Sequence, residues 1–177
     1  MGVRGIGLCL LLLLAAPARA EVVDRVMWVV GDELVLASDL ELDAVLTVLD
    51  PTPFWTLPRQ RPEERSVEAA MLRRLAGDLP LYTPREEEVR ARVERVRDQF
   101  RDRAAWEDFL GGWGLDERAL ATALRRRIVV ERYLARNLAA PPEDTERWQA
   151  ACRELLDDVR DRLRIRYVEP RGLPEEP

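Results

Sequence analysis

The sequence contains no histidine and no lysine, so all 28 of its basic side chains are arginines. Without histidine, the chain lacks the usual general base for serine and cysteine nucleophiles and the commonest zinc ligand. Without lysine, it has no side-chain amine for a Schiff base, and arginine stays protonated too firmly to act as a base. Carboxylates are scattered without the pattern of a catalytic cleft, and no glycine-rich phosphate loop is present. The sequence therefore predicts a protein that is not an enzyme and that holds no metal ion and no cofactor.

Long apolar runs are also missing, apart from one at the N-terminus. Arg4 precedes an apolar stretch over Ile6–Ala16, and the small residues Ala18 and Ala20 follow it. This order is typical of a cleaved signal peptide, here residues 1–20. The stretch is too short for a transmembrane helix, which needs about 20 apolar residues. We therefore expect an exported protein without stable membrane insertion.

Cysteine is scarce as well, because the expected mature chain contains only Cys152. A single cysteine excludes an internal disulfide, and its helical neighbours predict a buried, small apolar side chain. The 33 acidic residues give the whole chain a net charge of −5. Loss of the two arginines of the leader would change that charge to −7. An acidic chain of this kind is not expected to bind nucleic acid.

The organising stretch is Glu21–Leu42, which is predicted to form a β-hairpin leading into a helix. Apolar and other residues alternate over Arg25–Val30, Gly31-Asp32 provides a turn, and Leu34–Leu36 resumes the apolar pattern. A second alternating stretch, Leu163–Val168, lies at the other end of the chain and stops before Pro170. Since a lone hairpin leaves unpaired backbone groups at its edges, we expect this C-terminal strand to pair with it.

Apolar residues at helical spacing predict about five helices and one short helix between the two ends. The fold class is therefore mainly α, with a small antiparallel sheet formed by the N-terminal hairpin and the C-terminal strand. Expected helices cover about residues 39–49, 66–76, 84–100, 104–110, 117–137 and 148–163. Expected capping residues are Ser38 with Glu41, Ser66, Thr83 with Glu86, and Asp116. The run Arg125–Arg127 is predicted to belong to a solvated polar face.

Four prolines mark Asp50–Arg65 as a segment without a continuous helix, for which we expect an extended path. Phe54 and Trp55 lie in its middle. Either they anchor the segment to the body of the protein, or they form an exposed surface that binds a partner. We favour an anchoring role for Phe54 and a partner-facing role for Trp55, because neighbouring side chains of an extended segment point to opposite sides.

Four stretches resemble the periplasmic chaperones of the SurA type. They are VVDRVMWVVGDELVLASDLEL, MLRRLAGDLPLYTPREEEV, WEDFLGGWGLDERALATALRRRIVVERYL and WQAACRELLDDVRDRLRIRYVEP. The resemblance implies one chaperone domain over residues 21–169, with an N-terminal part (21–138), a linker (139–147) and a C-terminal helix and strand (148–169), followed by a tail (170–177). Family members usually carry a parvulin-type prolyl isomerase domain where this chain has only about ten residues, 137–147. That difference and the missing histidines argue against isomerase activity.

The resemblance implies a periplasmic holdase that binds unfolded or extended polypeptides, such as precursors of outer-membrane proteins. The expected peptide-binding residues are Phe54, Trp55, Trp106, Phe109 and Trp113, because a holdase needs apolar surface for client side chains. Two alternatives stay open: an accessory subunit that grips one folded exported partner, and a prolyl isomerase supported by family membership alone. The sequence leaves the oligomeric state open.

Overall fold

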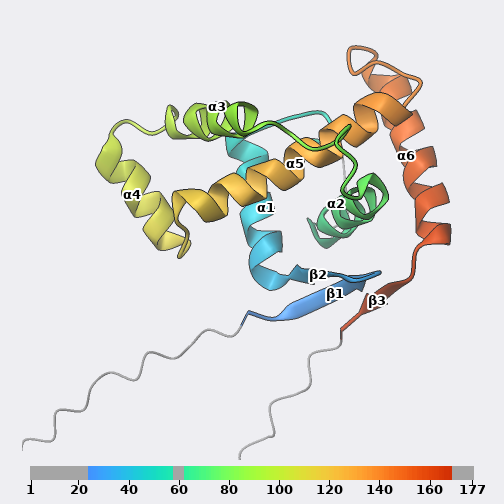
Figure 1. Ribbon diagram of the computed structural model, residues 1–177, viewed down its shortest axis with the longest axis horizontal. Helices are drawn as coiled ribbons and strands as arrows, with labels where there is room; N and C mark the ends of the chain where they lie inside the picture. The colour runs from blue at the N-terminus through green and yellow to red at the C-terminus, as the bar shows by residue number, and fades with distance from the viewer. Residues whose placement is uncertain (1–23, 58–61, 169–177) are drawn as a thin grey trace, which may run out of the picture.

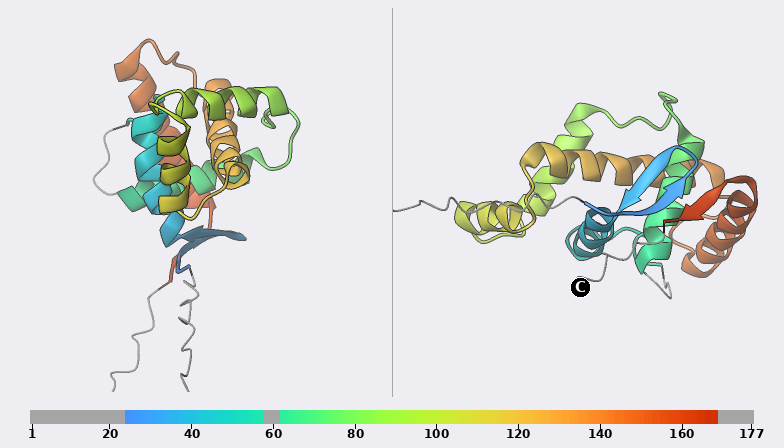
Figure 2. Two further views of the ribbon diagram at one scale, coloured as in Figure 1. Left: turned by 90° about the vertical axis from the view of Figure 1, so that its left-hand side faces the viewer. Right: turned by 90° about the horizontal axis from the view of Figure 1, so that it is seen from below.

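A computed structural model describes residues 24–57 and 62–168 of the chain (Figure 1). Within these ranges the fold is mainly helical with a small antiparallel sheet, as predicted. The elements are β1 (Val26–Val30), β2 (Glu33–Leu36), α1 (Ala37–Leu49), α2 (Pro62–Ala76), α3 (Glu86–Arg97), α4 (Arg103–Gly112), α5 (Glu117–Asn137), α6 (Thr145–Arg162) and β3 (Ile165–Tyr167). The long helix α5 runs through the middle, the sheet lies along one edge, and α4 lies at the end remote from α6 (Figures 1 and 2).

The sheet joins the two ends of the described chain, as the alternating patterns predict. Its strand order is β2-β1-β3, and both neighbours of β1 are antiparallel to it. Gly31 makes the hairpin turn with a φ of 65°, a backbone conformation that glycine adopts without a steric penalty. Trp28 lies opposite Tyr167, and their rings are 4.9 Å apart. The prediction that the C-terminal strand closes the sheet on the hairpin is confirmed.

Three groups of buried side chains form the core, and each joins elements that are distant in sequence. The first holds the segment after α1 against α2, α5 and α6, and it includes Phe54, Trp55 and Cys152. The second joins α1, α3, α4 and α5 around Leu46, Trp106 and Leu124. The third covers one face of the sheet with α2 and α6. Cys152 is fully buried, as expected for a small apolar side chain.

Three of the four expected helix caps are wrong, because the predicted side chains bond elsewhere and the helices begin at other residues. Helix α1 begins at Ala37, where Asp39 accepts a hydrogen bond from the Leu36 amide and Ser38 donates to Asp24. Helix α2 begins at Pro62, so Ser66 lies within it and donates to Asp43 at 2.6 Å. Thr83 donates to the carbonyl of Leu79, and α3 begins only at Glu86. The cap at Asp116 is confirmed, since its carboxylate accepts from the Ala119 amide at 2.7 Å.

The expected extended path for Asp50–Arg65 is also wrong in the parts that the structure describes. The chain turns over Pro53–Leu57, where the Thr56 amide donates to the carbonyl of Thr52 at 3.0 Å. Pro51 and Pro53 are compatible with such turns, because the amide hydrogen that proline lacks is not needed to close them. The expected linker (139–147) is shorter than predicted, because α6 begins at Thr145 with Asp144 as its N-cap. Residues 1–23, 58–61 and 169–177 lie outside the described part, including the expected signal peptide and the whole expected tail.

Truncation of the chain after Arg162 is expected to lower the free energy of unfolding by about 2–4 kcal/mol. The truncation removes the half-buried Leu163 and Ile165 from the sheet core and leaves the outer edge of β1 without its partner. The hydrogen bond from the Gly31 amide to the Arg164 carbonyl, 3.0 Å long, is lost as well. A thermal melt compared with a control truncated after Val168 checks this, and equal melting temperatures would contradict it.

None of the helices in the described part of the chain has the length and apolar character needed to cross a membrane.

Candidate functional site

An open groove of about 1000 Å³ lies at the end of the molecule formed by α3, α4 and α5. We call it the α4 groove. Its apolar lining consists of Phe100, Trp106, Leu110 and Leu115. Phe100 follows the end of α3, Trp106 and Leu110 lie on α4, and Leu115 lies in the turn before α5. The groove thus has an aromatic and aliphatic lining contributed by three successive parts of the chain.

Three aromatic rings form a continuous cluster beside this groove. The ring of Phe100 lies 5.4 Å from that of Trp106 and 4.9 Å from that of Phe109, and Trp106 and Phe109 are stacked at 5.7 Å. Trp106 is almost fully buried, whereas Phe100 and Phe109 are half-buried. Offset and edge-on ring pairs of this kind stabilise each other and leave ring faces and edges for a ligand. The cluster gives the groove a rigid apolar wall.

Local capping explains why α4 presents these rings in one direction. Asp102 caps the helix by accepting from the Ala105 amide at 2.8 Å. The helix continues through Gly111 and Gly112, two residues beyond its expected end at 110, and Trp113 is its C-cap. Gly114 then adopts a φ of 61°, and the next amide, that of Leu115, returns to the Leu110 carbonyl at 2.9 Å. The chain therefore reverses direction between α4 and α5, and this turn borders the groove.

A side-chain contact also links α4 to the start of α5. The indole Nε1 of Trp106 donates to Oε1 of Glu117 at 3.0 Å. Since Trp106 is only 3 % exposed, this bond satisfies a polar atom at the edge of the core and fixes the orientation of the indole ring. Glu117 itself is exposed and lines the groove.

The groove also carries an acidic rim that sequence patterns did not predict. Its charged lining residues are Arg97, Asp98, Asp102, Arg103, Glu107, Asp116 and Glu117. Five carboxylates against two guanidinium groups give this lining a formal charge of −3. The contributing residues come from the end of α3, from α4 and from the start of α5, all within residues 97–117, and the fold directs them to one groove. In the part of the chain that the structure describes, no group of three or more acidic or cysteine side chains is close enough to hold a metal ion.

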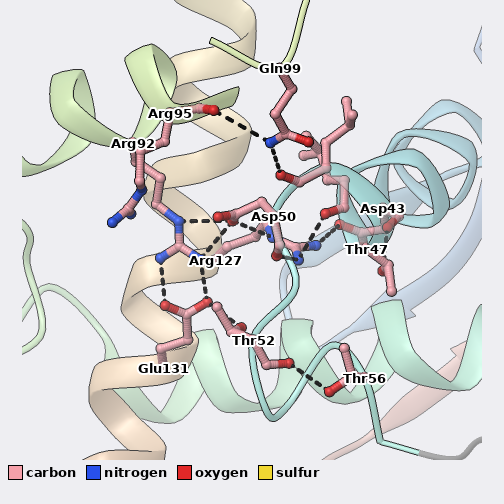
Figure 3. A network of polar contacts seen from close by, with 12 residues as sticks. Asp43, Thr47, Asp50, Thr52, Thr56, Arg92, Arg95, Gln99, Arg127 and Glu131 are labelled. Atoms are coloured by element: carbon pink, nitrogen blue, oxygen red, sulfur yellow. Dashed lines mark hydrogen bonds and ion pairs between the residues drawn. The ribbon is translucent and has the colours of Figure 1, made fainter. Parts of the chain in front are cut away.

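A buried ionic network holds the wall of the groove against the body of the protein (Figure 3). Arg92 of α3 donates to Asp50 at 2.8 Å and, through both terminal nitrogens, to Glu131 of α5 at 2.5 and 2.7 Å. Burial alone lowers the pKa of Arg92, but the hydrogen bonds to Glu131 and Asp50 outweigh it and raise the pKa above its usual value. The network fixes α3 to α5, and thereby fixes one side of the groove.

Arg127 of α5 is the second cation of this network and is only 1 % exposed. It donates to the carbonyl of Asp50 at 2.9 Å, and its guanidinium lies over the ring of Trp55, 3.9 Å from the centroid. Burial lowers its pKa to about 10, and the carboxylates of Asp43 and Asp50 offset only part of this effect. Arg127 is therefore a structural cation in the core, and the prediction that it belongs to a solvated face is wrong.

The structure separates the five expected peptide-binding residues into two sets. Trp106, Phe109 and Trp113 all belong to α4 or its C-cap, and Trp113 is 36 % exposed. Phe54 and Trp55 lie in a different core cluster and are 1 % and 0 % exposed. A side chain without exposed surface cannot contact a peptide in this conformation. The expected partner-facing role of Trp55 is therefore wrong, and both residues anchor the segment after α1.

Sequence reasoning missed Phe100 as a groove residue, although it placed this residue at the end of an apolar helix face. Its position three residues before α4 and its aromatic character were the available signals. No signal marked the acidic rim, because its members lie on polar faces that look like ordinary solvated surface.

Comparisons with protein families, with curated proteins and with solved structures find no match to this chain.

Proposed function

We propose that this protein is a non-catalytic chaperone that binds unfolded or extended polypeptide segments in the α4 groove. The observation that carries the proposal is the open groove of about 1000 Å³ with an aromatic wall. Apolar grooves with polar rims are a common way to hold peptide side chains, and aromatic residues contribute most to such binding. The resemblance of the sequence to SurA-type chaperones supports the same function and a periplasmic location. Precursors of outer-membrane proteins are the clients that this resemblance implies.

Replacement of Phe100 by alanine is expected to weaken the binding of a tryptophan-containing, unstructured peptide by about 1–2 kcal/mol. Phe100 lines the groove and contacts both Trp106 and Phe109, so its loss removes part of the apolar wall. Isothermal titration calorimetry measures the affinity, and a thermal melt of the same sample shows whether the fold is kept.

The matched control is Leu79→Ala, because Leu79 is an exposed apolar residue in the loop between α2 and α3. This variant is expected to bind the peptide as the unaltered protein does. Equal affinities of the Phe100 and Leu79 variants would contradict the location of the binding site. Capture of one folded partner in a fixed ratio, without binding to unfolded chains, would favour an accessory subunit instead.

The purified protein is expected not to accelerate cis/trans isomerisation of a proline-containing peptide. The chain has no histidine, and fewer than ten residues separate α5 from α6, where the family's isomerase domain would be inserted. A protease-coupled assay with a parvulin enzyme as positive control measures the rate. A rate increase that persists through repurification of the protein would show that it is an isomerase.

A further inference from the structure

The α4 groove combines its aromatic wall with a negative rim, and this combination restricts which polypeptides fit it. The lining carries five carboxylates and two guanidinium groups. The carboxylates of Asp102 and Asp116 cap α4 and α5, accepting from backbone amides at 2.8 and 2.7 Å. They thereby offset the partial positive charge of these two helix N-termini, which would otherwise attract an anion. The partial positive charges at the N-termini of α4 and α5 are therefore compensated, and the groove stays negatively charged.

Two carboxylates of the lining, those of Asp98 and Glu107, are exposed and do not cap a helix N-terminus. Asp98 follows the end of α3, and Glu107 lies in the middle of α4. Glu107 pairs with Arg103 at 2.6 Å, but both side chains are largely exposed, so the pair is weak and can exchange partners. An incoming cation can therefore contact carboxylates from two different elements without breaking a buried interaction.

An aromatic wall beside negative charge favours cations for two reasons. The low dielectric of an apolar wall strengthens the attraction between a ligand cation and nearby carboxylates. The faces of aromatic rings also attract guanidinium and ammonium groups directly. The half-buried ring of Phe100 lines the same groove as Asp98 and Glu107, and the ring of Phe109 lies behind it, 4.9 Å from that of Phe100.

We propose that the α4 groove selects extended polypeptide segments in which arginine or lysine lies next to an aromatic or large apolar side chain. The apolar side chain packs against the ring cluster, while the cation pairs with the carboxylates of the rim. This inference rests on the proposed function, because it specifies the chemical class of the segments that the same groove binds.

Three peptides of equal length test the selection. Each has a central tryptophan, flanked by two arginines, by two glutamines or by two glutamates. At low ionic strength the arginine peptide is expected to bind about tenfold more tightly than the glutamate peptide, with the glutamine peptide between them. The difference is expected to shrink when salt is added, since the rim is exposed to solvent. Equal affinities of the three peptides would overturn the proposed selection.

Two double variants separate the rim from the overall charge of the protein. Asp98→Asn with Glu107→Gln removes two of the five rim carboxylates and changes the formal charge of the lining from −3 to −1. The matched control, Glu94→Gln with Asp108→Asn, removes two exposed carboxylates of α3 and α4 that lie outside the groove lining. The rim variant is expected to bind the arginine peptide about fivefold more weakly and the glutamine peptide as before. The control variant is expected to bind both peptides as the unaltered protein does. If the two double variants lose the same affinity for the arginine peptide, the overall charge of the protein causes the loss, and the proposal is overturned.

The experiment also distinguishes failure of the selection from failure of the proposed function. If the three peptides bind with equal affinity, the groove binds polypeptide but does not select cations. If none of the three peptides binds, both the proposed function and the proposed selection are wrong.

Discussion

Replacement of Asp50 by asparagine is expected to lower the free energy of unfolding by about 3–5 kcal/mol, because the two buried cations Arg92 and Arg127 each lose a nearby carboxylate. Asp50 is 8 % exposed and accepts a hydrogen bond from Arg92 at 2.8 Å. Its carboxylate also lies 3.4 Å from Nε of Arg127. Glu131 remains as a partner for Arg92, but Arg127 retains only Asp43, at 3.9 Å, as a close carboxylate. Urea denaturation monitored by circular dichroism measures the loss.

The control for this prediction is Glu41→Gln, which neutralises an exposed carboxylate on the same helix, α1. Its effect on the free energy of unfolding is expected to stay within about 0.5 kcal/mol. If both variants unfold at the same urea concentration, the ionic network does not hold α1, α3 and α5 together as described.

Replacement of Trp55 by alanine is expected to cost about 3–5 kcal/mol of stability, the usual range for a large buried aromatic residue. Trp55 is completely buried, and its ring covers the guanidinium of Arg127 and contacts Phe54 at 4.9 Å, edge to face. The substitution therefore leaves a cavity and also removes the favourable ring face from a buried cation. Thermal and urea denaturation measure the loss.

Two further tryptophan variants make this prediction specific. Trp55→Phe keeps most of the ring, and the lost Nε1 has no hydrogen-bond partner within the described structure, so this change is expected to cost only about 1–2 kcal/mol. Trp113→Ala alters a partly exposed residue and is expected to cost less than about 1 kcal/mol. A stable Trp55→Ala protein with weakened peptide binding would restore the partner-facing role that the structure contradicts.

The sheet could be predicted from the sequence because its signals are local and agree with one another. Alternation over β1, the turn at Gly31 and the second alternating stretch around Ile165 each indicate strands. Strands with unpaired edges must find partners, so the pairing of the two chain ends follows from the same physics. The bounds of α5 were also predicted correctly, since Asp116 is both a good capping residue and the residue just before the apolar pattern begins.

The caps of α1 and α2 were not predictable by the same rules because tertiary contacts compete for the side chains, whereas Thr83 donates to the nearby carbonyl of Leu79. Ser38 donates to Asp24 and Ser66 donates to Asp43, and these partners are 14 and 23 residues away in sequence. A capping rule considers only neighbours within a few residues, so it cannot weigh such contacts.

The burial of Arg92 and Arg127 was not predicted from the sequence, for a related reason. Arg92 and Arg127 occur in sequences rich in charge, which normally form a solvated helix face. Their burial depends on Asp50 and Glu131, which lie 42 and 39 residues from Arg92. The acidic rim of the α4 groove was missed for a different reason: its members lie close together in the sequence but on polar surfaces that resemble ordinary solvated helix faces. By contrast, Trp106, Phe109 and Trp113 belong to one short stretch, and the ring pair of Trp106 and Phe109 follows from their spacing on α4. Their role in peptide binding stays a prediction.

Hydrogen exchange with and without a saturating, tryptophan-containing unstructured peptide is the most direct test of where polypeptide binds. The account predicts that added protection is concentrated in residues 97–117, which include the end of α3, α4 and the start of α5. The sheet and α6 are expected to exchange as they do without peptide. Protection confined to the sheet or to the segment around Trp55, with no change over residues 97–117, would contradict the assignment of the α4 groove as the binding site.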